Sequence, residues 1–291
     1  MPAVWDPAFR KAFYARWGRE NAVISAQARR VEYEDFEQLL SIKAVMGGTE
    51  HYFVDGRRIA VDDDTFLILN AGRRYGSRID QPSPLHTFSI FFRPRLAEDT
   101  WTALRKPADQ LLDNPQSHSG SNIEFDERLR DHDRAVTPAL LFIRQSLDSN
   151  DGDDLRLEEQ LHWLMARMLD AERVHARSQE LIPAAKPATR RELWRRLGLA
   201  VNYIHTAYRL PIGLRDMASA AHLSPFHFLR LFTAVYRMTP SGYLNRKRSQ
   251  AARRLMRDSR MSMVDIAAAV GFGSRTTLFR HVKGNARIRG S

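Results

Sequence analysis

The chain has 291 residues, a length typical of two domains, and 43% of them are hydrophobic, which is too many for a disordered protein. It contains no cysteine, which excludes disulfides, thiolate metal sites and thiol nucleophiles. The N-terminal segment lacks a hydrophobic core of signal-peptide length, and no stretch approaches the roughly 18 apolar residues that cross a bilayer. These features favour a cytoplasmic protein without a membrane partner.

The charge of the chain is divided unevenly. Residues 189–291 contain 20 basic and four acidic residues, a net charge of +16, whereas residues 1–188 contain 25 basic and 30 acidic residues, a net charge of −5. A domain as basic as the second attracts a polyanion, because each phosphate that it neutralises releases condensed counterions. Charge alone leaves open a merely soluble basic surface or an anionic membrane surface, although no basic amphipathic helix with an aromatic face stands out.

Residues from about 31 to 95 are expected to form short strands. Turn signals at Gly47–Gly48 and Asp55–Gly56 separate short apolar runs, and no helical stretch lies between them. Strands of this size and spacing predict an antiparallel barrel or sandwich.

The residues after 95 change to a helical period. Long helices are predicted from Thr137 to Leu147 and from Leu155 to about Arg177. The second carries an apolar stripe that needs a partner, either the chain's own barrel or the same helix of a second copy. This stripe consists of Leu157, Leu161, Leu164, Met165 and Met168. The two prolines of IPAAKPAT (182–189) place a domain boundary there.

An internal repeat occupies the region after Arg190. The segment LRDMASAAHLSPFHFLRLF (214–232) matches MVDIAAAVGFGSRTTLFRHV (263–282), with an offset of 49 residues before the turn and 50 after it. Each copy predicts a short helix, a tight turn and a second helix, with Ala218 and Ala267 where the helices cross. In the turns, Gly271 reaches a positive φ easily and His222 tolerates one.

The second helix of each copy has the features of a recognition helix, which lays its N-terminal side chains on base edges in the major groove. Ser224 and Ser274 are expected to cap these helices, and Pro225 suits the first helical position. Arginine suits guanine through a bidentate contact, and threonine offers a hydroxyl or a methyl group. We therefore expect Arg230, Arg275 and Arg280 to contact bases. The expected phosphate contacts are Ser224, Arg246, Lys247, Arg248 and Ser274.

A basic helix, Ser241–Asp258, separates the two copies and is expected to hold them rigidly apart. A spacing of about one turn of DNA, roughly 34 Å, would let both copies enter the same face of a duplex. Two copies in one strongly basic domain favour double-stranded DNA as the partner. The alternative is a helical bundle with a solvated basic face.

The repeat resembles the AraC/XylS family of bacterial transcriptional regulators over about 100 residues. The resemblance rests on LRDMASAAHLSPFHFLRLFTAVYRMTPSGYLNRKRSQAARRLM followed by IAAAVGFGSRTTLFRHV. It implies base contacts by Phe226, Leu229, Arg230, Arg275, Thr276, Thr277 and Arg280. The final segment, HVKGNARIRGS, departs from the family because it lacks a second threonine-proline element, so its last helix is expected to be shortened or altered.

The upstream barrel resembles the cupin-like effector domain of the same family. Such barrels often hold a metal through an H-x-H pair, but His51 is followed by Tyr52 and Phe53, so no metal site is predicted. No G-x-S-x-G, Walker A or G-x-G-x-x-G pattern occurs, and we expect no catalytic residues, no enzyme activity and no cofactor. A barrel can hold one small ligand. The candidates for lining an effector pocket, each of which fits ordinary core better, are Tyr52, Phe66, Tyr75, His86, Phe88 and Phe91.

The sequence as a whole predicts an α+β protein with an N-terminal cupin-like antiparallel β-barrel, a helical linker and an all-α C-terminal domain of two helix-turn-helix units. The expected bounds are 1–122 for the effector domain, 123–188 for a linker that could dimerise, and 189–291 for the DNA-binding domain. The expected function is sequence-specific transcriptional regulation. The alternatives are a non-specific architectural DNA-binding protein and a cupin-type enzyme with a basic appended domain. Expected partners are double-stranded DNA and RNA polymerase, with a small-molecule effector and a second copy of the chain as further candidates.

Overall fold

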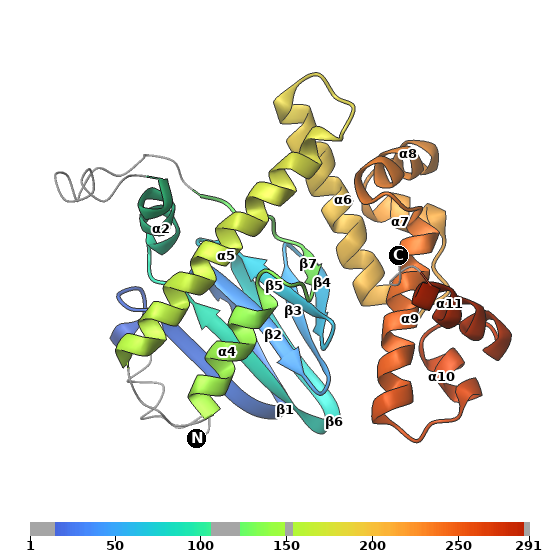
Figure 1. Ribbon diagram of the computed structural model, residues 1–291, viewed down its shortest axis with the longest axis horizontal. Coiled ribbons are helices and arrows are strands. Elements are labelled where there is room, and N and C mark those ends of the chain that lie inside the picture. The colour runs from blue at the N-terminus through green and yellow to red at the C-terminus, as the bar shows by residue number, and fades with distance from the viewer. Residues whose placement is uncertain (1–14, 106–122, 149–153, 288–291) are drawn as a thin grey trace. The chain divides into compact units, whose positions relative to one another are not determined.

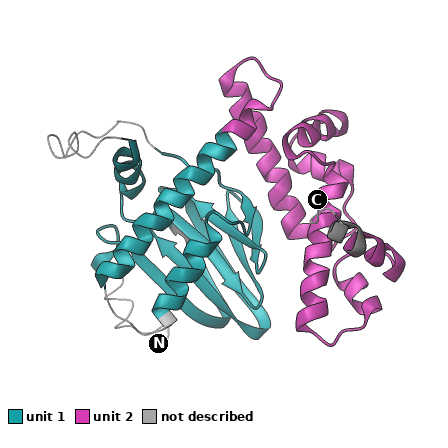
Figure 2. Ribbon diagram, viewed as in Figure 1, with its two compact units in different colours: residues 1–176 teal, residues 177–291 magenta. Residues whose placement is uncertain are grey.

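A computed structural model describes residues 15–105, 123–148 and 154–287, and it divides the chain into two compact units, residues 1–176 and 177–291 (Figure 2). The division falls inside helix α5 (Asp154–Glu180), before the predicted boundary at 188. The reason is packing: Ile182, within the predicted linker, belongs to the hydrophobic core of the C-terminal unit. The last four residues of the HVKGNARIRGS segment lie outside the described residues.

The N-terminal unit is built on one antiparallel sheet of seven strands (Figure 1). Its order is β4-β3-β6-β2-β5-β7, and β1 pairs with β6. The long strand β6 organises the sheet, because its first half pairs with β3, its second half with β2, and nearly its whole length with β1. The strands are β1 (Ala22–Glu37), β2 (Ser41–Met46), β3 (Thr49–Val54), β4 (Arg57–Asp62), β5 (Thr65–Leu69), β6 (Arg74–Phe91) and β7 (Leu129–Asp131).

The two faces of this sheet bury different clusters, as the alternation of side chains along a strand requires. One cluster, which includes Val45, Leu67 and Leu85, draws residues from all seven strands, so this face is the interior of a barrel-like sheet. The other, which includes Phe66 and Phe88, packs against helices. Together with the helical C-terminal unit, this arrangement confirms the predicted α+β fold class.

Helices cover the outer face of the sheet. They are α2 (Leu96–Arg105), α4 (Thr137–Asp148) and α5. The predicted apolar stripe of α5 lies in the helix-facing cluster, where Leu161, Leu164, Met165 and Met168 are buried and Leu157 is partly buried. The stripe therefore packs on the chain's own sheet, which leaves it unavailable for pairing with a second copy.

Charged and hydroxyl-bearing side chains are buried inside the sheet. Lys43 and Glu50 are 2% and 3% exposed, and the Lys43 ammonium lies 3.5 Å from the ring centroid of Phe91. Glu50 accepts a hydrogen bond of 2.8 Å from the Thr87 hydroxyl. Burial lowers the pKa of Lys43 to about 7, although the Glu50 carboxylate opposes the shift.

The predicted effector-pocket residues are divided between the two faces. Tyr52, Tyr75 and Phe91 lie on the interior side, where Tyr52 and Tyr75 join the inner cluster and Phe91 contacts Lys43. Phe66 and Phe88 instead pack beneath the helices. His86 alternates with the inward-facing Leu85 and Thr87, and its Nε2 lies 2.7 Å from the Ser25 hydroxyl. The six candidates therefore do not share one face of the sheet, because side chains alternate along a strand and a shift of one residue reverses the face.

Buried Lys43 is expected to make the stability of the N-terminal unit depend on pH. Above about pH 7 the folded state releases the Lys43 proton, whereas the unfolded chain, with the ordinary pKa of 10.5, retains it. The unfolded state then binds more protons, so the free energy of unfolding should rise from about pH 7 to about pH 9. We expect the double variant Lys43→Met/Glu50→Gln to show a smaller rise in urea titrations across this range. Equal slopes for wild type and variant would contradict the assignment.

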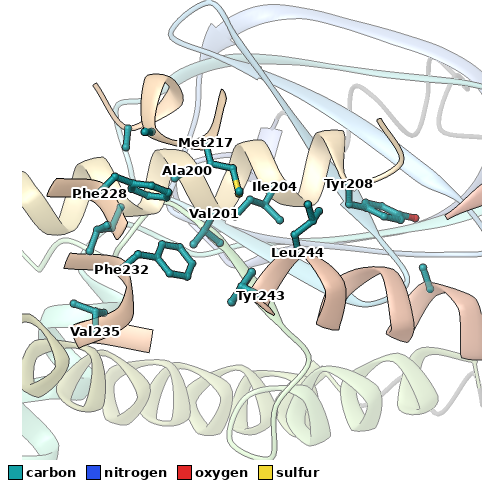
Figure 3. Close-up of a cluster of buried hydrophobic side chains, with 14 of the residues drawn as sticks. Ala200, Val201, Ile204, Tyr208, Met217, Phe228, Phe232, Val235, Tyr243 and Leu244 are labelled. Carbon is teal, nitrogen blue, oxygen red and sulfur yellow. The ribbon is translucent and has the colours of Figure 1, made fainter. Parts of the chain in front are cut away.

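In the described residues of the C-terminal unit, all regular secondary structure is helical. Its helices are α6 (Pro187–Ala207), α7 (Leu214–Ala220), α8 (Pro225–Tyr236), α9 (Pro240–Asp258), α10 (Met263–Ala269) and α11 (Arg275–Arg287). Buried side chains from α6, α7, α8 and α9 converge in one core, in which Phe228 and Phe232 are fully buried (Figure 3). Ile266, Val270 and Leu278 extend the same core into α10 and α11. The predicted repeat therefore corresponds to α7–α8 and α10–α11, which share one hydrophobic core.

Candidate nucleic-acid interface

The first unit, α7–α8, has the predicted helix-turn-helix geometry. Met217 and Ala218 are fully buried, which brings the helices close together. In the turn, His222 has a φ of +52°, the left-handed conformation that its side chain tolerates. The Ser224 hydroxyl caps α8 by accepting a hydrogen bond from the His227 backbone N–H at 3.4 Å. The predicted roles of His222 and Ser224 in local structure are thus confirmed.

The second unit, α10–α11, repeats the first at the level of backbone atoms. The Phe272 N–H donates to the Ala267 carbonyl at 2.8 Å, as the Leu223 N–H donates to the Ala218 carbonyl at 3.0 Å. Gly271 has a φ of +84° in the turn, and Ser274 caps α11 by accepting from the Thr277 N–H at 3.2 Å. The one-residue difference in offset between the copies is absorbed at this turn.

The two second helices, α8 and α11, present their predicted base-contacting residues at or near the surface. On α8, Phe226 and Arg230 are exposed and Leu229 is half-buried. On α11, Arg275, Thr276 and Arg280 are exposed, whereas Thr277 is half-buried with its hydroxyl 3.0 Å from that of Ser274. Within the described residues, no hydrogen bond or ion pair holds Arg230 or Arg275. Both guanidinium groups are therefore available to an outside acceptor.

The connecting helix α9 departs from the sequence prediction at two positions. Lys247 is 1% exposed, and its ammonium lies 5.6 Å from the ring centroid of Tyr208, so it is not on the surface where a phosphate would reach it. Arg248 donates 2.8 Å hydrogen bonds to the carbonyls of Tyr208 and Leu210. We therefore remove both residues from the predicted phosphate contacts. Of the three predicted on α9, Arg246 is only half-buried and remains a candidate.

The turn after α6, residues 208–210, holds the second helix-turn-helix unit, α10–α11, in place. Arg248 satisfies carbonyls that the end of α6 leaves without helical partners. The backbone of Gly271 also approaches this turn so closely that a Cβ at this position would lie 2.8 Å from the carbonyl oxygens of Tyr208 and Arg209. One segment thus contacts both α9 and the turn of the second unit. Sequence reasoning missed this role of Arg248, because a basic residue on a basic helix gives no sign that it points inward.

Comparison with known proteins identifies this architecture. Residues 217–287 match the helix-turn-helix domain family. Residues 217–287 therefore form a helix-turn-helix domain of the AraC type. This confirms the resemblance predicted from the repeat, and both α8 and α11 lie inside the matched region.

Two relatives match the chain over short stretches. A stretch of 65 residues is 38% identical to the HTH-type transcriptional regulator Rv1931c of Mycobacterium tuberculosis, covering 22% of this chain and 25% of that protein. A stretch of 80 residues is 35% identical to the regulatory protein PocR of Salmonella typhimurium, covering 28% of this chain and 26% of that protein. The matches thus span about a quarter of the length of these relatives.

A solved structure with broader coverage is a lysine-to-alanine variant of apo ToxT from Vibrio cholerae. It is 10% identical, covers 91% of this chain and 93% of its own, and has a TM-score of 0.39.

The described residues offer little for other kinds of site. No cluster of three or more histidine, aspartate or glutamate side chains suited to a metal ion occurs among them. None of their helices has the length and apolar character needed to cross a membrane.

Proposed function

We propose that this protein is a sequence-specific DNA-binding transcriptional regulator. The observation that carries the proposal is the pair of capped helices, α8 and α11, in one basic domain, each with exposed side chains on its N-terminal turns. A single helix-turn-helix would be weak support, but two units that share one core form a rigid reader for two successive turns of the major groove.

In the proposed mechanism, base contacts and phosphate contacts have separate roles. Arg275 and Arg280 on α11, and Arg230 on α8, would contact base edges. Phosphate contacts by Arg246 and by the N-terminal ends of α8 and α11, at Ser224 and Ser274, would fix the position of the domain on the duplex without distinguishing sequences. Phe226, Leu229, Thr276 and Thr277 would complete the base contacts.

The N-terminal unit would regulate this DNA binding. The regulating partner would be a small molecule, a second copy of the chain or RNA polymerase, as expected of the family. Each would act on the N-terminal unit or on the helix-turn-helix domain. Within the sheet, a polar ligand would interact with the buried polar groups around Lys43 and Glu50.

Replacing Arg275 by alanine is expected to cost about 1–3 kcal/mol of binding free energy on the preferred duplex and to relax the preference at one base pair. The reason is the loss of a bidentate contact to a base edge. Fluorescence anisotropy on the preferred duplex and its single-base variants would measure both effects. Arg195→Ala removes the same charge from α6, where Arg195 is bonded to Glu192 at 2.8 Å, and is the matched control. Equal loss on every duplex would instead make Arg275 a phosphate contact and favour a non-specific architectural protein.

A further inference from the structure

The two reading helices present different chemistry to DNA. The first turn of α11 begins with exposed Arg275 and Thr276, which are polar. The first turn of α8 has no arginine or lysine and presents Phe226, which is 75% exposed, the highest value among the large hydrophobic side chains of the described residues. The same helix nevertheless buries Phe228 and Phe232 completely. Phe226 is therefore not a core residue that has been displaced, and no other side chain of the described residues covers its ring.

The backbone fixes the position of this ring. Ser224 caps α8, Pro225 occupies its first position and Phe226 its second, so the ring projects from the end of the helix that enters the groove. Phenylalanine has only two side-chain torsions, and little conformational entropy is lost when the ring is ordered. Leu229, one turn further along and half-buried, adds apolar surface.

The apolar group that double-stranded DNA exposes in its major groove is the 5-methyl group of thymine. A phenyl ring placed over the hydrogen-bonding edge of a G·C pair would instead desolvate donors and acceptors without replacing their hydrogen bonds. We propose that α8 selects thymine through contact of Phe226 with the 5-methyl group, whereas α11 selects its bases through the arginines. The preferred site would then be asymmetric, with a thymine-dependent half read by α8 and an arginine-read half about one helical turn away. This inference rests on the proposed function.

Thymine-to-uracil replacement tests the inference, because it removes the methyl group and leaves base pairing unchanged. The full chain would first be used to select its preferred duplex from a random pool. Uracil would then be placed at each thymine of that duplex, and affinities measured by anisotropy. Loss of one buried methyl group should weaken wild-type binding about fourfold at the critical thymine of the α8 half. Phe226→Ala should bind more weakly and show no further loss with uracil at that position.

Two controls separate methyl recognition from general effects. Leu210→Ala removes another exposed apolar side chain from the same unit and should keep the full sensitivity to uracil. Phe226→Ala should retain the wild-type unfolding midpoint, since the ring is mostly exposed. A 5-methylcytosine·G pair placed at the critical position should bind wild type more tightly than cytosine·G, because it restores the methyl group in the same groove.

The possible failures are distinguishable. If no motif is enriched from the pool, the proposed function itself fails. If a motif is enriched but uracil has no effect on wild type, or the same effect on wild type and Phe226→Ala, methyl recognition is overturned. If Phe226→Ala binds DNA like wild type yet loses transcription in a purified system with RNA polymerase, the ring docks on protein, which also overturns the proposal.

Discussion

Replacing Gly271 by alanine is expected to remove the second helix-turn-helix unit from DNA binding. The residue has a φ of +84°, a conformation that costs an alanine about 1–2 kcal/mol. The new Cβ would also lie 2.8 Å from two backbone carbonyl oxygens of the turn after α6, so that turn or the second unit must move. Strain and displacement together should destabilise the second helix-turn-helix unit by about 2–5 kcal/mol.

The effect of Gly271→Ala can be separated from a general loss of folding. Gly273→Ala is the matched control, since a Cβ at Gly273, two residues later in the same turn, meets nothing within 4 Å. We expect Gly271→Ala to bind a two-part site no more tightly than a duplex that retains only the part read by α8. Gly273→Ala should keep the full difference between these duplexes in anisotropy titrations. If Gly271→Ala also kept it, the close approach to the turn after α6 would not be needed for function.

Replacing Phe232 by alanine is expected to destabilise the first helix-turn-helix unit and the core that both helix-turn-helix units share. Phe232 is fully buried, and its ring lies 5.3 Å from that of Phe228 and 5.5 Å from that of Tyr243, measured between centroids. Truncation of a buried phenylalanine removes these contacts and leaves a cavity, at a cost of about 3–5 kcal/mol. A domain with the usual free energy of unfolding of about 5–15 kcal/mol would lose much of that stability.

Hydrogen exchange followed by mass spectrometry would detect this loss segment by segment. In Phe232→Ala, exchange should accelerate in α6, α8 and α9, which contribute to the core around Phe232. Phe226→Ala makes the same substitution on the same helix at an exposed position and should change stability by no more than about 0.5 kcal/mol. Similar exchange in the two variants would show that the core does not depend on Phe232.

Features set by local sequence could be predicted most fully. The repeat predicts both helix-turn-helix units, because its signals determine the backbone conformation of only a few neighbouring residues. These signals are the serine caps, a proline at the first helical position and a glycine in the turn. Ser224, Ser274 and Gly271 all have the predicted local roles in the structure. The base-contacting role of the exposed residues on α8 and α11 remains a prediction.

Features set by distant contacts could not be predicted. Lys247 and Arg248 are neighbours of Arg246 on a basic helix, and only the position of the turn after α6 decides that they face inward. In the barrel, a shift of one residue along a strand moves a side chain from the interior to the helix-covered face, so the sequence does not reveal that Phe66 and Phe88 pack on the face opposite to that of Tyr52. Likewise, the boundary between the units depends on where Ile182 packs, which the prolines of the linker do not reveal.

Selection of a preferred duplex from a random pool by the full chain, followed by anisotropy against a scrambled duplex between about 50 and about 200 mM salt, tests the central claim most directly. The account predicts that one motif is enriched and that it binds at least about tenfold more tightly than the scrambled duplex at every salt concentration, with both affinities falling as salt rises. Equal affinity for both duplexes, falling in parallel with salt, would contradict a sequence-specific regulator and show that the two units bind DNA through its phosphates alone.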